Sequence, residues 1–101
     1  MNPFTVILTP EAQSDILRLD PVVQTRILNR LDWMGENAEL LRHQALQGNE
    51  WRGCLRYRLG VYRIIYQLDQ PNKKLTVLLV IAAMYINKWG RRLGRSVPMA
   101  P

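Results

Sequence analysis

The chain has 101 residues, a formal net charge of +6, 48% hydrophobic residues and 22% charged residues. This length supports one domain, and the composition is that of an ordinary soluble globule. The longest apolar run, Leu75–Ile86, is too short to span a bilayer, the start of the chain carries no visible secretory signal, and the single cysteine, Cys54, excludes an internal disulfide. We therefore expect a cytoplasmic protein without a membrane partner.

The N-terminal part of the chain predicts one strand followed by a helical hairpin. Residues Phe4–Leu8 are apolar and β-branched, which is typical of a strand. Thr9 and Pro10 form a helix start signal, because threonine caps free amides and proline fits the first helical position. Asp20 and a second proline repeat this signal after a short break. Apolar residues at helical spacing then predict a helix over residues 21–36, with a buried stripe of Val23, Ile27, Leu31 and Met34.

The second half of the chain predicts a three-stranded antiparallel meander. Residues Ala38–Leu46 fit either a short further helix or an ordered loop. Three β-rich runs separated by turn signals follow: Trp51–Leu59, Val61–Leu68 and Leu75–Ile81. The order of elements predicts an α+β fold of the sandwich type, with an N-terminal strand, a helical hairpin packed on one face of the sheet, and the meander.

The end of the chain differs in composition from the rest. From residue 82 onward it carries four basic side chains and no acid, together with several glycines and prolines. We expect residues 1–88 to form the folded domain and residues 89–101 to form a mostly disordered basic tail, which has little to bury. A basic cluster in a small domain indicates nucleic acid or an acidic protein as a partner, and a solvated basic face is the alternative.

A second basic cluster is predicted within the meander. Residues two apart in a strand share a face, so Arg56 and Arg58 should project together, with Arg52 in line beyond them. Arg63 lies just past the turn on the adjacent strand. Converging guanidinium groups suit phosphate, because each donates paired hydrogen bonds and stays charged at any working pH. The alternative is that these are surface arginines paired with Glu50 or with Asp69.

Other candidate chemistry is weaker. His43 is the only histidine, and no cluster of histidines or cysteines accompanies it, so we expect no metal ion and no other cofactor. Cys54 with a distant histidine is a poor nucleophile pair, and a small buried residue is the preferred interpretation. Trp33 and Trp51 are expected to be packing residues, with base stacking by Trp51 as the alternative.

Four segments share their order and spacing with one known family: Leu8–Ala12, Leu19–Gln24, Leu46–Gly48 and Arg56–Tyr66. Over residues 4–80 the chain resembles the RelE/ParE superfamily of toxins from type II toxin–antitoxin systems. The resemblance implies a RelE-like endoribonuclease that cleaves mRNA on the ribosome and inhibits translation. In that reaction the ribose 2′-hydroxyl attacks the adjacent phosphate, and a cyclic phosphate results. It also implies a protein antitoxin as partner, in a hetero-oligomer.

Residue matching gives Arg56, Arg58 and Arg63 the basic positions of this family. There they would act as catalytic residues that stabilise the charge of the reacting phosphate, and together with Arg52 they would bind RNA. Some relatives have lysine at the first two positions, where one can act as general base, but arginine is too hard to deprotonate for that role. Two alternatives stay open: a ParE-like inhibitor of DNA gyrase, and an inactive toxin remnant that still binds the antitoxin.

The C-terminal ending departs from the family. Many relatives follow the last strand with Gly-His-Arg-Arg-(Asp/Glu)-Val-Tyr, whereas this chain has Ile81–Asn87. Residues Val80–Trp89 can be encoded as GTC ATC GCC GCG ATG TAT ATA AAT AAA TGG. If the codon for Leu79 ends in G and reading starts at that G, one base earlier, the same bases encode Gly-His-Arg-Arg-Asp-Val-Tyr-Lys and a stop. We therefore hypothesise that the residues from about Val80 onward are a frameshifted reading, which leaves the cleavage activity of this chain open.

Overall fold

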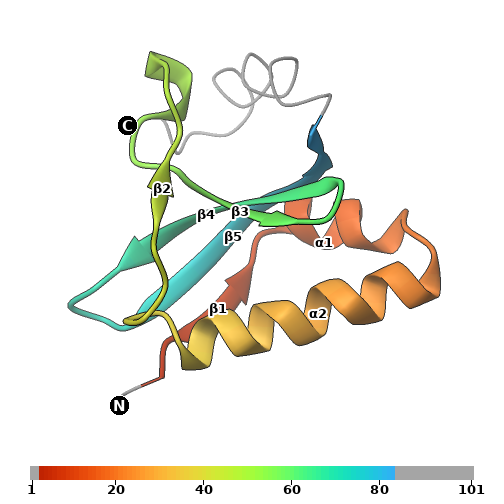
Figure 1. The fold of residues 1–101 in the computed structure, drawn as a ribbon, viewed down its shortest axis with the longest axis horizontal. Coiled ribbons are helices and arrows are strands. Elements are labelled where there is room, and N and C mark those ends of the chain that lie inside the picture. The colour runs from red at the N-terminus through yellow and green to blue at the C-terminus, as the bar shows by residue number, and fades with distance from the viewer. Residues whose placement is uncertain (1–2, 84–101) are drawn as a thin grey trace.

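The computed structural model describes residues 3–83. The expected basic tail, residues 89–101, lies outside this range. Two α-helices, a short 3₁₀ helix and five strands follow one another along the chain (Figure 1): β1 (Thr5–Leu8), α1 (Pro10–Leu17), α2 (Pro21–Glu36), β2 (Gln44–Ala45), η1 (Asn49–Trp51), β3 (Leu55–Leu59), β4 (Tyr62–Asp69) and β5 (Lys74–Ala82). The predicted α+β class is confirmed.

Both helices start at the predicted signals. Thr9 caps α1 through its hydroxyl oxygen, which accepts a hydrogen bond from the backbone N–H of Ala12 at 3.1 Å. Pro10 and Pro21 occupy the first positions of α1 and α2, where proline costs no backbone hydrogen bond. The bounds of α2 are those predicted. Neither helix of residues 3–83 has the length and apolar character needed to cross a membrane.

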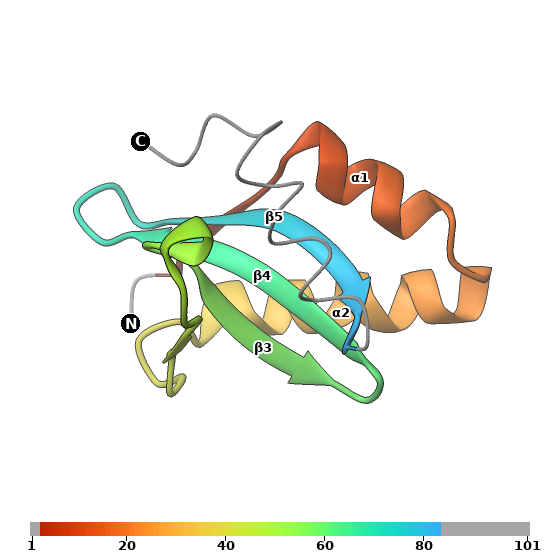
Figure 2. The same ribbon diagram turned by 90° about the horizontal axis from the view of Figure 1, so that it is seen from above.

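The sheet has the strand order β1-β5-β4-β3-β2, and Figure 2 shows β5, β4 and β3 side by side in front of α2. The predicted meander is present, because β4 pairs antiparallel with both β3 and β5. In contrast to the expected antiparallel sheet, β1 pairs parallel with β5. Parallel neighbours require a long crossover rather than a tight turn, and the helical hairpin is part of that connection.

Two details of the strand predictions are wrong. The segment Ala38–Leu46 holds a two-residue strand, β2, which pairs with Leu55 and Arg56 at the edge of the sheet. The predicted strand Trp51–Leu59 begins only at Leu55. The residues before it form η1 and a turn in which Gly53 has φ +79°, a conformation that a strand does not contain.

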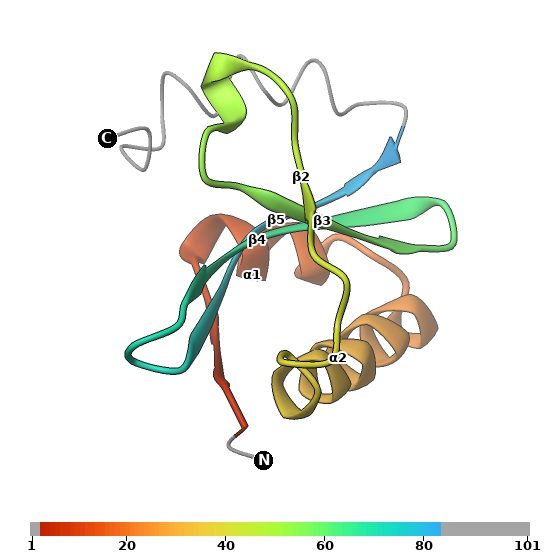
Figure 3. The ribbon, with the colours of Figure 1, turned by 60° about the vertical axis from the view of Figure 1, so that its left-hand side comes forward.

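The helices cover one face of the sheet, and Figure 3 shows η1 on the other side. On the helix face, the side chains of α2 pack against β4 and β5 through residues such as Ile27, Leu31, Ile64 and Val77. On the outer face, a smaller apolar cluster contains Trp51, Cys54, Ile65, Leu78, Leu79 and Ile81. Trp51 is 4% exposed, so its predicted packing role is confirmed.

Side-chain hydrogen bonds join Thr9 and α1 to the backbone around a bulge in β5. The pairing register between β4 and β5 shifts at Leu78, so this strand is locally irregular. The hydroxyl of Thr9 donates to the carbonyl oxygen of Val77 at 3.0 Å. The carboxylate of Asp15 accepts a hydrogen bond from the backbone N–H of Val80 at 3.0 Å. Two side chains of the first helical segment therefore bond the backbone on both sides of the bulge.

Candidate anion-binding site on the sheet

The outer face of the sheet carries arginines of β3. Arg56 and Arg58 are exposed, whereas the alternate residues Leu55, Tyr57 and Leu59 are partly buried against the helix-side core. The alternation is the one expected from the spacing in the sequence, because successive strand residues point to opposite faces. The two guanidinium groups therefore lie on the side of the sheet away from the helices.

Strand pairing brings a third arginine to the same surface. Arg58 lies directly opposite Arg63 of β4, and Arg56 lies opposite Ile65, which belongs to the outer cluster. Directly opposite residues in an antiparallel pair share a face, with Cβ atoms about 4.5–5.5 Å apart. We call the surface formed by Arg56, Arg58 and Arg63 the arginine face.

Arg52 does not continue this line, in contrast to the expectation from sequence. It is exposed in the turn that follows η1, where its backbone N–H donates to the carbonyl oxygen of Asn49 at 3.2 Å. The positive φ of Gly53 redirects the chain between Arg52 and the start of β3. The alternation of a strand therefore does not extend back to this residue.

The guanidinium group of Arg63 is held at the β3–β4 turn. Its Nη1 atom donates to the carbonyl oxygen of Tyr62 at 3.0 Å and to that of Gly60 at 3.1 Å. Desolvation lowers the pKa of Arg63, and the charges of Arg58 and Arg56 lower it further. Arg58 and Arg56 therefore lie close enough for their charges to act on Arg63, and arginine stays protonated at any working pH.

Among the described side chains, no carboxylate forms an ion pair with the three arginines of the arginine face. The ion pairs there join Arg18 to Asp15 and Lys73 to Glu39. The carboxylate of Asp69 accepts hydrogen bonds from Asn72 instead of pairing with an arginine, so the alternative of pairing with Asp69 is wrong, and the side chain of Glu50 lies outside the described ones.

Like charges placed directly opposite on adjacent strands destabilise a sheet, and a bound anion removes this cost. Arg56 is also oriented by a neutral side chain, because its Nε atom donates to the Oε1 atom of Gln44 at 3.4 Å. The arrangement is therefore suited to bind an anion such as phosphate.

His43 is committed to a structural role on the helix side. Its Nε2 atom lies 2.8 Å from the carbonyl oxygen of Ala38, and its Nδ1 atom lies 2.5 Å from the hydroxyl oxygen of Tyr66. A carbonyl only accepts, so we assign the ring proton to Nε2 and let Nδ1 accept from the hydroxyl. Burial raises the pKa of Tyr66 to about 12, and nearby Tyr57 adds to the shift.

Cys54 is a buried residue of the outer cluster, as the sequence predicts. It is 1% exposed, and burial raises the pKa of its thiol. Because the thiolate is the reactive form, this environment makes Cys54 a poor nucleophile.

Sequence reasoning missed a second basic site on α2. Arg26, Arg30 and Trp33 follow one another at helical spacing, a signal that places them on one side of the helix. Trp33 is 42% exposed, so the expectation that it packs in the core is wrong. It lies instead against the guanidinium group of Arg30, 5.1 Å from the ring centroid.

Known proteins share this sequence pattern and fold. The family model described as the ParE toxin of the type II toxin–antitoxin system parDE matches residues 6–83. The toxin–antitoxin complex RelBE2 of Mycobacterium tuberculosis is similar at 25% identity and a TM-score of 0.73, over 81% of this chain and 93% of that chain. No curated protein sequence matches the chain.

Two further solved structures share the fold at lower identity. The archaeal RelE–RelB complex from Pyrococcus horikoshii has 22% identity and a TM-score of 0.64, over 80% of this chain and 96% of that chain. The intact RelBE complex of E. coli has 20% identity and a TM-score of 0.62, over 79% of this chain and 96% of that chain.

Proposed function

The chain belongs to the family of ParE toxins of type II toxin–antitoxin systems, within the RelE/ParE superfamily, and we propose that it acts as a RelE-like toxin whose arginine face binds mRNA on the ribosome. One observation carries this proposal. Arg58 and Arg63 lie directly opposite each other on neighbouring strands, with Arg56 beside them on the same face. The paired charges cost stability, and a phosphate bound between them offsets that cost.

The chemistry of RNA cleavage assigns a role to these arginines. The 2′-hydroxyl of a ribose gives up its proton to a base, and its oxygen attacks the adjacent phosphorus atom. The bond to the next nucleotide's 5′-oxygen breaks, that oxygen takes up a proton, and a cyclic phosphate is left. Negative charge grows on the phosphate oxygens during this step, and guanidinium groups aimed at them stabilise the transition state. The role of these arginines is therefore to bind the phosphate and to stabilise its growing negative charge.

The proton of the 2′-hydroxyl needs a different acceptor. Arginine does not deprotonate at working pH, and His43 is engaged with Tyr66 and Ala38 on the opposite side of the sheet. The arginine face therefore contributes binding and electrostatic stabilisation, with the general base supplied from elsewhere. A base from the ribosome or from outside residues 3–83 satisfies this requirement.

An antitoxin is the second partner that we propose. The relatives from M. tuberculosis, P. horikoshii and E. coli were solved as complexes with their antitoxins. An acidic segment of the antitoxin would neutralise the arginine face and compete with RNA for it. Toxin and antitoxin would then form a hetero-oligomer in the cytoplasm.

Cleavage of mRNA on purified ribosomes tests the proposal. We expect the full chain to cleave mRNA only when ribosomes are present. Arg63→Ala should reduce the rate by about 10²–10³, the usual cost of losing one group that stabilises a developing negative charge. Lys74→Ala removes an equal charge outside the arginine face and should leave the rate unchanged. Tight antitoxin binding with neither mRNA cleavage nor gyrase inhibition would identify an inactive toxin remnant, and equal rates for Arg63→Ala and the parent chain would refute the assigned role.

Inhibition of DNA gyrase is the second candidate function, and the match to the ParE family model favours it. Purified gyrase and relaxed plasmid distinguish the two activities. Loss of supercoiling activity with intact mRNA would replace the ribosomal proposal with this one. Uninhibited gyrase together with ribosome-dependent cleavage would exclude it.

A further inference from the structure

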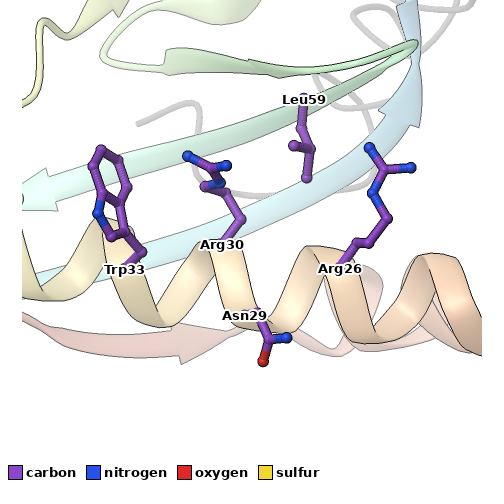
Figure 4. A pocket seen from close by; sticks show the side chains of 5 residues that line it. All are labelled: Arg26, Asn29, Arg30, Trp33 and Leu59. Carbon is purple, nitrogen blue, oxygen red and sulfur yellow. The ribbon is translucent and has the colours of Figure 1, made fainter.

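A groove lies between α2 and β3 on the helix side of the sheet. It has a volume of about 420 Å³ and is lined by Arg26, Asn29, Arg30, Trp33 and Leu59. Figure 4 shows Arg26, Arg30 and Trp33 extending from α2 toward the strand, with Leu59 pointing toward them, whereas Asn29 points away from the sheet. Two guanidinium groups and an indole ring therefore face one hollow.

The positive charge of this groove is not balanced by acids. The carboxylates that form ion pairs in residues 3–83 are Asp15 and Glu39, and neither pairs with Arg26 or Arg30. Arg26 is exposed and Arg30 is half-buried. Two arginines that stay charged and have no carboxylate partner among the described side chains are suited to an anionic ligand.

Arg30 is held in place before any ligand binds. Its Nη1 atom donates to the hydroxyl oxygen of Tyr57 at 3.1 Å, and its guanidinium carbon lies 5.1 Å from the ring centroid of Trp33. These contacts leave other N–H groups of the guanidinium free to donate to an anion. The exposed part of the Trp33 ring offers a surface on which a nucleic-acid base can stack.

The groove and the arginine face meet at the β3–β4 turn. The Nη2 atom of Arg26 lies 3.6 Å from the position that a Cβ atom on Gly60 would take, and Arg63 donates to the carbonyl oxygen of the same glycine. Gly60 is therefore flanked by Arg26 of α2 and by Arg63 of the arginine face. Positive charge continues around this end of the sheet.

The edge of β3 between the arginine face and the groove is only partly covered by another strand. β2 pairs only with Leu55 and Arg56, so no described strand lies beside the rest of β3 on that side. Building on the proposed function, we propose that Arg26 and Arg30 form a second phosphate-binding site, which extends the path of a single RNA strand from the arginine face around the edge of β3. The ligand is the phosphodiester backbone, and Trp33 stacks on one of its bases.

Binding of oligoribonucleotides of two lengths to the full chain tests this inference. A fluorescein-labelled strand of about three nucleotides should occupy the arginine face alone, and one of about eight should also reach the groove. The variant R26A/R30A should bind the long strand on the order of tenfold more weakly, and the slope of log K against log salt should fall by about 1.4, or about 0.7 per lost phosphate contact. Its binding of the short strand should stay unchanged.

Two further variants secure the interpretation. R42A/K74A removes the same charge from exposed positions outside both sites and should retain long-strand binding. Arg26→Glu leaves the packing of Arg30 intact and should weaken long-strand binding even if R26A/R30A unfolds.

The possible failures have different signatures. Equal affinities of R26A/R30A and R42A/K74A for the long strand, with short-strand binding intact, would overturn the inference and leave the proposed function standing. If R26A/R30A loses affinity for a glutamate-rich peptide but keeps its RNA binding, the inference would also be overturned, because the groove would then bind an acidic protein segment. A parent chain that binds neither strand would refute the proposed function itself.

Discussion

Arg58 and Arg63 illustrate a conflict between stability and binding at the scale of single residues. They occupy directly opposite positions on β3 and β4. We expect Arg58→Gln to raise the free energy of unfolding by about 0.2–1 kcal/mol at low salt, because it removes a like-charge pair across the strands. The gain should shrink at high salt, where exposed charges are screened. RNA affinity should fall in the same variant.

Urea unfolding at two salt concentrations measures this effect. Arg52→Gln is the matched control, because Arg52 lies outside the strand and should leave stability unchanged. A less stable Arg58→Gln protein at low salt would show that the arginine pair does not strain the sheet.

Tyr66 predicts how stability depends on alkaline pH. Burial raises its pKa to about 12 in the folded protein, compared with about 10 in an unfolded chain. Between about pH 10 and 12 the folded state keeps a proton that the unfolded state has lost, so this contribution to stability is complete below pH 10 and disappears as the pH rises to 12. It amounts to about 2–3 kcal/mol.

Comparison with Tyr66→Phe isolates this contribution from the other groups that titrate at high pH. The parent chain should lose about 2–3 kcal/mol more than the variant across this window in urea unfolding experiments. Parallel losses in the two proteins would show that Tyr66 has an ordinary pKa in the folded state.

At the scale of elements, local signals predict the helices better than the strands. The starts at Thr9 and Asp20 and the apolar stripe of α2 are encoded in neighbouring residues, so α2 has the predicted bounds. β2 lacks such a signal, because a two-residue strand has no alternation to detect. The parallel pairing of β1 with β5 joins residues far apart in sequence, and nothing local to Thr5–Leu8 specifies that partner.

The contact of α2 with β1 depends on a glycine. A Cβ atom on Gly35 would lie 2.7 Å from the Cγ2 atom of Val6 and 2.8 Å from the carbonyl oxygen of Phe4. Gly35→Ala should therefore destabilise the protein by about 1–3 kcal/mol through overpacking, although alanine is favoured over glycine in an isolated helix by about 1 kcal/mol. The free energy of unfolding in urea measures the outcome.

Glu36→Ala serves as the control, because the side chain of Glu36, next to Gly35 in the sequence, is exposed. Its effect should stay within about 0.5 kcal/mol of the parent chain. A stabilised Gly35→Ala protein would mean that helix propensity outweighs packing at this contact.

At the scale of the whole molecule, the two basic sites differ in how far sequence predicts them. Strand alternation places Arg56 and Arg58 together, and the short turn brings Arg63 opposite Arg58. The groove beside α2 combines side chains from a helix and a strand, and its shape depends on how α2 packs under the sheet. Spacing along α2 identifies Arg26 and Arg30 as neighbours, but only the tertiary structure places them beside Leu59.

The frameshift hypothesis makes a prediction about the gene. We expect the codons from Val80 onward, read one base earlier, to encode Gly-His-Arg-Arg-Asp-Val-Tyr-Lys and a stop. Sequencing the DNA decides this, and a chain carrying the restored ending should arrest growth more strongly than this chain when expressed without antitoxin. Codons that do not yield the ending in the neighbouring frame would disprove the hypothesis.

The salt dependence of RNA binding is the most direct measurement of the central role of the arginine face. Removing three phosphate contacts in the triple variant R56Q/R58Q/R63Q should weaken binding of a short oligoribonucleotide and lower the slope of log K against log salt by about 2, at about 0.7 per contact. An unchanged slope and affinity would show that RNA does not bind these arginines, and would contradict the account given for this family member.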